Sequence, residues 1–172
     1  VERMGRIVTE FRDFARLPVP HLEVVDLASI LKSVVVLHQG VTPDVEVQWD
    51  GPEELLVTVD ADQMTAVATN LVKNAIEAHG LQPASGARVL VRLRDSEGGG
   101  VAWSVEDNGS GMPDEVRAKL FTPYFTTKSS GTGLGLAITH RIVIEHQGRI
   151  NAVSEVGKGT QFMVQLPKSS AP

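Results

Sequence analysis

The sequence predicts an α/β (α+β) two-layer sandwich, in which helices cover one face of a mixed, mostly antiparallel sheet. Two patterns carry this prediction. Strand-like and helix-like segments are mixed without strict alternation, and several strand-like segments follow one another in hairpin-like pairs. A doubly wound parallel sheet would instead place a helix between successive strands. A chain of 172 residues can bury the core of one main domain.

The composition argues against several classes of protein. The net charge of -5 and the pI of about 5.5 argue against binding nucleic acid through a basic face. The absence of cysteine excludes disulfide scaffolds and thiolate metal sites. No apolar run approaches the roughly 18 residues of a membrane span, and the first residues lack a signal-peptide pattern.

The first residues have the pattern of a helix whose apolar stripe repeats at spacings of three and four: Val1, Met4, Val8, Phe11 and Ala15. The prolines of Leu17–Pro20 end this helix. It packs either on its own domain or in a helical bundle of which it is the last piece. Because the chain begins inside the pattern, we expect it to be a fragment of a longer protein.

The remaining elements follow from periodicity and from turn residues. Helices are predicted over 27–38, with Asp26 as the N-cap, and over 61–79, 113–120 and 136–146, the last capped by Gly148. Strands are predicted over 45–49, 55–59, 89–93, 101–105, 149–153 and 160–166. The tail 168–172 is expected to be disordered.

Two glycine clusters, Asp107–Gly111 and Gly131–Gly135, bracket a segment rich in Phe, Thr, Ser and Lys. Glycine clusters mark places where the main chain bends unusually or approaches a ligand closely. The second cluster precedes a helix N-terminus, which favours an anion such as phosphate. Asp107 is an acceptor suited to an exocyclic amine. The pattern therefore predicts a purine site and a phosphate site joined by a lid.

The helix over 61–79 carries two amides, Asn70 and Asn74, four residues apart and therefore on one face. Either they are satisfied amides that bind backbone or water, or one offers its oxygen to a metal. Mg²⁺ takes few protein oxygens beside phosphates and water, so a single Asn is sufficient.

The lid segment gathers three aromatic residues, Phe121, Tyr124 and Phe125. They form either a small hydrophobic cluster beneath a loop or the anchors that hold a lid against the domain. In the second interpretation Thr126, Thr127 and Lys128 face the phosphates.

Taken in order, these motifs resemble the N, G1, F, G2 and G3 boxes of sensor histidine kinases. The matching stretches are Asn70–Asn74, Asp107–Gly111, Phe121–Phe125, Gly131–Gly135 and Gly157–Thr160. The resemblance covers residues 24–167. It divides the chain into the end of a second dimerisation helix with its linker (1–20), in the style of nitrogen-regulation sensor kinases, a catalytic ATP-binding domain (21–167) and a tail (168–172).

The resemblance implies the Bergerat ATP-binding fold, with ATP and Mg²⁺ as cofactors. It implies that Asp107 accepts the adenine amine, that Asn74 holds Mg²⁺, and that Asn70, Lys73 and Lys128 serve the phosphates. The other implied nucleotide-binding residues belong to the G1, F, G2 and G3 boxes: Gly109, Gly111, Met112, Phe121, Tyr124, Phe125, Thr126, Thr127, Gly131, Thr132, Gly133, Leu134, Gly135, Leu136 and Thr160.

Asn70 separates the possible chemistries. Related ATPases and anti-sigma-factor serine kinases carry a Glu at this position, four residues before the metal Asn, to act as a base. An amide has no lone pair basic enough for that role, so the resemblance favours transfer to an imidazole over hydrolysis or serine phosphorylation. A nucleotide-binding module without transfer activity remains the other alternative.

The sequence departs from the family at two points. Glu77 stands where a Lys often follows the metal Asn, and no histidine of the chain lies in a phospho-acceptor motif. The acceptor is therefore expected upstream, on the other helix of a dimerising bundle. The resemblance further implies a response-regulator receiver domain as partner, no nucleic acid, and a cytoplasmic location for this domain in a protein anchored in the bacterial inner membrane.

Overall fold

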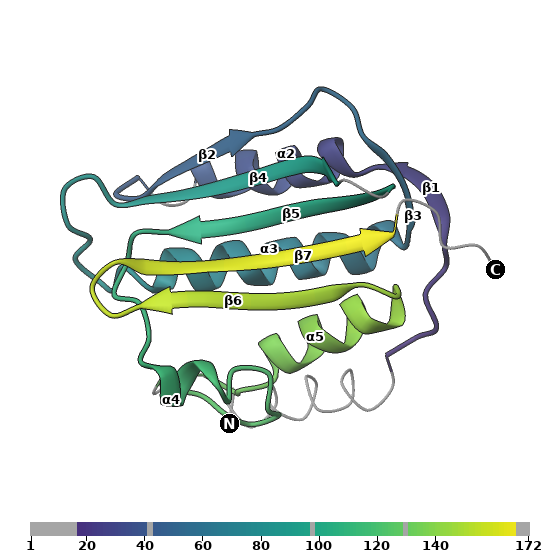
Figure 1. Ribbon diagram of the computed structural model, residues 1–172. Coiled ribbons are helices and arrows are strands. Elements are labelled where there is room, and N and C mark those ends of the chain that lie inside the picture. Colours follow the sequence, from purple (N-terminus) through teal and green to yellow (C-terminus); the bar gives the residue numbers. More distant parts are fainter. Residues whose placement is uncertain (1–16, 41–42, 97–98, 129–130, 168–172) are drawn as a thin grey trace, which may run out of the picture.

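The computed structural model describes residues 17–40, 43–96, 99–128 and 131–167. The predicted N-terminal helix and the tail 168–172 lie outside the described residues. Within them, no helix is long and apolar enough to cross a membrane. The predicted two-layer fold is confirmed, and its elements, labelled as in Figure 1, are β1 (Glu23–Asp26), α2 (Leu27–Gln39), β2 (Glu46–Asp50), β3 (Leu56–Val59), α3 (Ala61–Glu77), β4 (Arg88–Ser96), β5 (Gly100–Asp107), α4 (Asp114–Arg117), α5 (Gly135–Glu145), β6 (Arg149–Glu155) and β7 (Gly159–Pro167).

The main sheet has five strands in the order β2-β4-β5-β7-β6. The β2–β4 pair is parallel, and the other pairs are antiparallel. In Figure 1 α3 runs behind the sheet, α2 lies behind β2 and β4, and α5 is seen below β6. The described helices therefore cover one face of the sheet and leave the other free of helices. Because successive side chains of a strand point to opposite faces of the sheet, every second side chain points into the layer between the sheet and the helices.

This alternation places apolar side chains in the core and also directs two polar side chains, Asp107 and Thr160, toward the inner face. On β5 the buried residues Val101, Trp103 and Val105 are followed at the same spacing by Asp107. On β7, Thr160 begins the series that continues with buried apolar residues, and it lies directly opposite Asp107. The inner face of the sheet therefore carries a carboxylate and a hydroxyl where β5 ends and β7 begins.

The two predicted strands 45–49 and 55–59, which a turn joins, lie in different sheets. β3 pairs with β1, antiparallel, in a separate two-stranded sheet, whereas β2 pairs with β4 and has no other partner strand among the described residues. The side chain of Asp26 explains the arrangement, because its Oδ1 accepts from Ala28 N (3.0 Å), as the predicted N-cap, and from Leu55 N (2.9 Å). One carboxylate thus starts α2 and holds the entry to β3.

The end of α5 also differs from the prediction. Gln147, not Gly148, takes the left-handed conformation, with φ 58°. The N–H groups of Gln147 and Gly148 donate to Ile144 and Val143, which satisfies the last carbonyls of the helix. Gly148 is required for a different reason, because a Cβ there would lie 2.6 Å from the carbonyl oxygen of Gln165 on β7.

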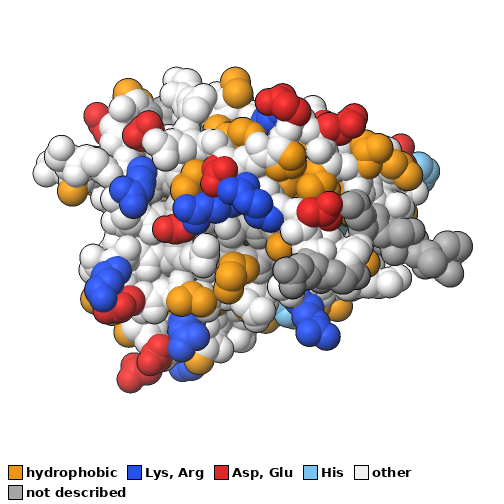
Figure 2. Space-filling model, turned by 45° about the horizontal axis from the view of Figure 1, so that its top comes forward, with side chains coloured by type: hydrophobic (Ala, Val, Ile, Leu, Met, Phe, Trp, Pro, Cys, Tyr) orange, Lys and Arg blue, Asp and Glu red, His pale blue; other side chains and the backbone are white. Residues whose placement is uncertain are grey.

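The open face of the sheet carries paired charges. Arg92 contacts Asp50 and Glu106 at 3.3 and 2.7 Å, and Arg94 contacts Asp50 at 2.7 Å. Figure 2 shows acidic and basic side chains interspersed with single hydrophobic ones on this side of the molecule. The open face is therefore a mixed, solvated surface.

Candidate active site

Helix α3 presents a polar stripe beside its buried one. Its apolar face packs into the core, whereas Asn70, Lys73, Asn74 and Glu77 are only partly buried or exposed. Their spacing of three and four residues places all four side chains on one side of the helix. This stripe is one wall of a cavity.

Asp107 forms part of the opposite wall. It is 5% exposed, and its Oδ1 accepts from Gly109 N at 2.9 Å. Burial raises the pKa of the Asp107 carboxyl above its ordinary value, although hydrogen bonds from the Gly109 and Thr160 backbone oppose this rise. A buried carboxylate that can accept further hydrogen bonds favours a ligand that donates them.

Thr160 lies opposite Asp107, and a residue that the sequence did not reveal, Ser154, lies opposite Thr160 on the next strand. The Ser154 hydroxyl lies 2.9 Å from Thr160 Oγ1, bonds Gly159 O at 3.0 Å, and accepts from Met112 N at 2.8 Å. It thereby joins the G1 loop to the β6–β7 hairpin. No signal in the sequence distinguishes Ser154 from an ordinary outward residue of a strand.

The glycines of the G1 and G3 boxes allow these segments to approach. Gly111 has φ 64°, and a Cβ there would overlap the Glu155 carbonyl oxygen. Gly159 has φ 110°, and a Cβ there would overlap the carbonyl oxygen of Asp107. Each position needs glycine for its backbone angle and for space.

The lid segment is held at its two ends. The ring of Phe121 lies 5.2 Å from that of His140 on α5. Tyr124, expected as an anchor, is 54% exposed, has φ 65°, and donates its N–H to Gly133 O at 2.9 Å. The backbone of Tyr124, rather than its ring, therefore joins the two ends of the lid, because its left-handed backbone directs the N–H toward Gly133.

The start of α5 packs directly on α3. A Cβ at Gly135 would lie 2.8 Å from Asn70 Oδ1, and Asn70 Nδ2 donates to the buried Thr139 Oγ1 at 2.8 Å. Asn70 thus links the two helices. The first turn of α5, with its free N–H groups, faces the polar stripe of α3.

Lys128 completes the polar side of the cavity. Its Nζ donates to Asn74 Oδ1 at 2.9 Å and forms an ion pair with Glu77 Oε2. Lys73 Nζ lies 3.9 Å from the other carboxylate oxygen of Glu77. Glu77, a departure from the family pattern, is therefore the carboxylate that both lysines approach.

These walls enclose a cavity of about 500 Å³, which lies within the usual range for small-molecule sites. Most of the predicted site residues line it: Asn70, Lys73, Asn74, Asp107, Gly111, Met112, Phe125, Thr126, Thr127, Lys128, Gly131, Thr132, Gly133, Gly135, Leu136 and Thr160. Residues that were not predicted for the site also line it, most of them apolar: Glu77, Ala78, Ser110, Val116, Leu120, Ile138 and Phe162.

Four predicted residues do not line the cavity, and each has a structural role instead. Leu134 is fully buried at the N-cap position of α5, and Phe121 packs against the core. Gly109 fits against α3, where a Cβ would lie 2.8 Å from Ala78 O. Tyr124 is exposed, and its N–H joins the lid segment to Gly133 O.

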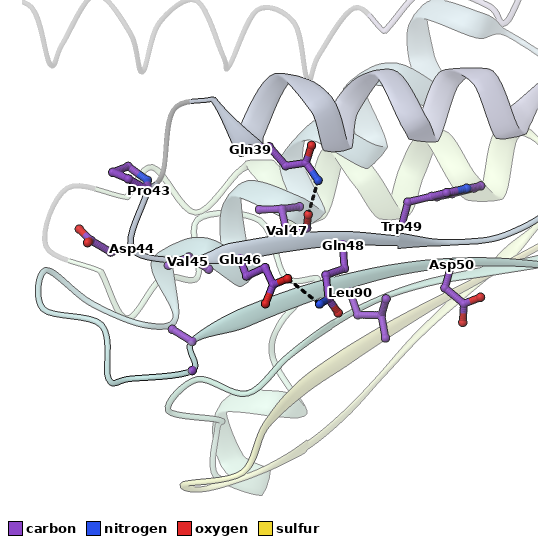
Figure 3. A pocket seen from close by; sticks show the side chains of 12 residues that line it. Gln39, Pro43, Asp44, Val45, Glu46, Val47, Gln48, Trp49, Asp50 and Leu90 are labelled. Carbon is purple, nitrogen blue, oxygen red and sulfur yellow. Dashed lines mark hydrogen bonds between the residues drawn. The ribbon is translucent and has the colours of Figure 1, made fainter.

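A second, more open hollow runs along the outer edge of β2 (Figure 3) and encloses about 1010 Å³. Its polar groups bond one another, since Gln39 Nε2 donates to Val47 O at 2.6 Å and Gln48 Nε2 to Glu46 Oε1 at 2.8 Å. The Gln39 contact caps a carbonyl of an exposed strand edge, which discourages strand pairing with other chains. The smaller cavity is the better candidate, because polar groups from several elements converge on it.

Residues 59–170 match the family of histidine kinase-, DNA gyrase B- and HSP90-like ATPases. The chain is 35% identical over 169 residues to sensor histidine kinase ZraS of Escherichia coli, covering 96% of this chain and 35% of ZraS. It is 37% identical over 166 residues to nitrogen regulation protein NtrY of Azorhizobium caulinodans, covering 95% of this chain and 21% of NtrY. The chain thus spans about a third or less of these relatives.

Solved structures agree. The nucleotide-free catalytic domain of histidine kinase ThkA has a TM-score of 0.76 and 32% identity, covering 86% of this chain and 96% of that domain. Full-length ShkA in complex with AMPPNP has a TM-score of 0.83 and 26% identity, covering 96% of this chain and 36% of ShkA. The chain therefore belongs to the histidine kinase-, DNA gyrase B- and HSP90-like ATPase family. Within that family its place is with the ATP-binding catalytic domains of sensor histidine kinases, as the order of the boxes predicted.

Proposed function

We propose that this domain binds Mg-ATP in the cavity between α3, the G1 loop and the lid. We further propose that it transfers the γ-phosphoryl group to a histidine that lies upstream of Val1 in the full-length protein. The observation that carries the proposal is the convergence on one cavity of a buried carboxylate, the N-terminal turn of α5 and the polar stripe of α3. These three features suit a purine, an anion and a metal ion respectively.

In the proposed complex Asp107 accepts the exocyclic amine of adenine, and apolar lining residues such as Leu120, Ile138 and Phe162 enclose the base. The triphosphate extends toward Gly131–Gly135 and the first turn of α5, where N–H groups and the helix dipole favour negative charge. Lys73, Lys128 and the two lid threonines, Thr126 and Thr127, remain the proposed phosphate contacts.

The donor set fits Mg²⁺. Asn74 Oδ1 already accepts from a cation, the Lys128 ammonium, at 2.9 Å, and amide and carboxylate oxygens are ligands of the kind that Mg²⁺ takes. Bound there, the ion would neutralise charge on the phosphates during transfer. We propose Asn74 as its ligand.

The acceptor chemistry follows from Asn70. Its amide is engaged with the Thr139 hydroxyl and offers no base to activate water or a serine hydroxyl, whereas a neutral imidazole needs none. This supports histidine phosphorylation over the two alternatives within the fold, hydrolysis and serine phosphorylation. A module that only binds nucleotide is the remaining alternative.

The full-length protein is proposed to dimerise through the upstream helical bundle and to pass the phosphoryl group to an aspartate of a receiver domain. Histidine kinase ThkA, 28% identical with a TM-score of 0.81 over 98% of this chain and 48% of ThkA, was solved in complex with the response regulator TrrA. From the resemblance to sensor histidine kinases we also propose that the full-length protein is anchored in the bacterial inner membrane.

Asp107→Asn tests the adenine assignment. The amide would present a donor to the adenine amine, so we expect the affinity for AMPPNP to fall about 10- to 100-fold, the cost of an unpaired buried donor. Isothermal titration calorimetry measures this. Affinity equal to that of the wild type would contradict the role of Asp107.

Asn74→Ala tests the metal assignment. We expect weaker AMPPNP binding in Mg²⁺ and little change in EDTA, because only the ion loses a ligand. An equal loss in both conditions would contradict the proposed role of Asn74.

The transfer reaction requires the longer chain that includes the upstream helix. With labelled ATP, we expect a phosphoryl group that is stable in alkali and labile in acid, as in a phosphohistidine, and that moves to a receiver domain. Release of phosphate without a labelled protein would favour an ATPase. An acid-stable label would favour a serine kinase, and binding without label or release would favour a module that only binds nucleotide.

A further inference from the structure

The ammonium group of Lys128 bonds two side-chain oxygens of α3. Lys128 Nζ contacts Asn74 Oδ1 and Glu77 Oε2, which come from residues three apart on one helix. Side chains at that spacing are neighbours on the helix surface. The amide oxygen and the carboxylate oxygen therefore converge on a single point in the cavity, and that point already holds a positive charge.

This point is accessible, and the carboxylate of Glu77 is directed toward it. Glu77 and Lys128 side chains are each 40% exposed, so the pair is accessible from the cavity. The other oxygen of Glu77 lies 3.9 Å from Lys73 Nζ, also on α3, which leaves Oε2 directed toward Lys128. Lys73 thus orients the carboxylate of Glu77 through Oε1, and Lys128 binds its Oε2.

An amide oxygen and a carboxylate oxygen are a donor set that Mg²⁺ prefers to an ammonium, because the ion is doubly charged and hard. Ammonium and Mg²⁺ cannot both sit on the same two oxygens, since their charges repel at that distance. We propose that Asn74 and Glu77 together form the divalent-cation site, and that Lys128 holds this site until Mg²⁺ exchanges for its ammonium group. This inference rests on the proposed function and adds Glu77 to it as a second metal ligand.

The exchange couples the metal to the lid. When Mg²⁺ takes the two oxygens, Lys128 is released beside Thr126 and Thr127, in the part of the cavity lining proposed for the phosphates. Binding of the ion and repositioning of the lid lysine are then one event. By linkage, whatever holds Lys128 on α3 opposes Mg²⁺ to the same extent.

The test measures binding of AMPPNP by calorimetry, in EDTA and at saturating Mg²⁺, for the wild type, Glu77→Gln and Lys128→Met. We define the magnesium enhancement as the ratio of the two dissociation constants, Kd in EDTA over Kd in Mg²⁺. The intrinsic affinity of Mg²⁺ for the nucleotide is common to all variants, so differences in this ratio report on the protein.

For Glu77→Gln we expect binding at saturating Mg²⁺ to weaken about tenfold, as for loss of a metal-site carboxylate, while binding in EDTA stays equal or tightens. For Lys128→Met we expect Mg²⁺ alone, titrated by calorimetry without nucleotide, to bind more tightly than to the wild type, because the ion no longer displaces an ammonium. Glu115→Gln and Lys119→Met make the same charge changes on or beside α4, outside the cavity lining, and should leave the enhancement unchanged.

The outcomes separate the two levels of the proposal. Equal or tighter binding of Glu77→Gln at saturating Mg²⁺ would overturn the metal role, because Glu77 would then only repel phosphate. Equal or weaker binding of Mg²⁺ alone to Lys128→Met, compared with the wild type, would overturn the exchange. Failure of the wild type to bind AMPPNP in either condition would instead overturn the proposed function. Thermal unfolding without ligand checks that each variant is folded.

Discussion

The fold buries Asp107, which disfavours its ionised form, whereas the proposed chemistry uses its carboxylate. The alternation of β5 directs its side chain inward, where Val105 and the other inward residues of the strand are apolar. Burial raises the pKa of the Asp107 carboxyl because ionisation in this environment loses hydration. A carboxylate at such a position reduces stability, which supports the proposal that Asp107 serves to bind a ligand.

We therefore expect the stability of the nucleotide-free Asp107→Asn variant, relative to the wild type, to rise with pH. A carboxyl with a raised folded-state pKa binds more protons in the native state than in the unfolded state, so the wild type loses stability as pH rises. The window begins near the ordinary Asp value of about 3.9 and ends at the raised value. Urea unfolding of both proteins across this range measures the difference, and a constant difference would contradict the buried, ionised carboxylate.

At this scale the sequence predicted the cavity residues whose signal is local. Asp107 and Thr160 occupy strand ends next to glycines, and Asn70 and Asn74 stand out as amides on an apolar helix. Contacts between distant segments could not be predicted in this way. Nothing in the sequence joins Ser154 to Met112, or Lys128 to Glu77, because these contacts arise only when the hairpin and the lid fold onto the rest.

Helix α3 is the element that connects the rest, and its start depends on Asp60. This N-cap accepts from Gln63 N and from His21 N, both at 2.9 Å, so it also fastens the segment that precedes β1. The Asp60 N–H in turn donates to His146 Nε2 at 3.0 Å, at the end of α5. The first turn of α3 thus gathers three separate parts of the chain.

Asp60→Ala is expected to lower the free energy of unfolding by about 1–2 kcal/mol, the usual cost of losing an N-cap. Asp62→Ala, in the first turn of the same helix, is the matched control and should cost less. Burial of Asp60 raises the pKa of its carboxyl, but the hydrogen bonds from the N–H groups of Gln63 and His21 outweigh this effect. The pKa of Asp60 therefore lies below its ordinary value. The advantage of the wild type should therefore be complete above about pH 4 and decline as pH falls through the lowered pKa. A loss equal to that of the control would contradict the capping role.

The type of each element could be predicted because hydrophobic periodicity is a local property of the sequence. The pairing of the strands could not be predicted in the same way. The segments 45–49 and 55–59 read as a hairpin, yet β3 pairs with β1, a four-residue strand too short for its alternation to stand out. The decisive contact, from Leu55 N to Asp26 Oδ1, spans 29 residues. Similarly, Gly148 is the obvious cap by residue type, but the left-handed residue is Gln147, because close packing on β7 requires the glycine one position later.

For the whole molecule, the two-layer arrangement explains where a ligand can act. The sheet is covered by α2, α3 and α5 on one face (Figure 1), and the open face is occupied by paired charges such as Arg94 and Asp50. The cavity lies at one end of the covered side, between α3, the end of β5 with the start of β7, and the lid. A nucleotide there would contact elements from the middle of the chain to near its end.

Because the proposed ligand bridges these elements only in the folded state, Mg-AMPPNP should stabilise the whole domain. At a concentration of 100 times Kd the gain is about 2.7 kcal/mol, which for a domain of this size raises Tm by roughly 5–10 °C. Differential scanning fluorimetry of the wild type with and without Mg-AMPPNP measures the shift. Asp107→Asn should lose most of it at the same ligand concentration, since its Kd is higher. A shift of equal size in both proteins would mean that the nucleotide stabilises the domain from a site other than this cavity.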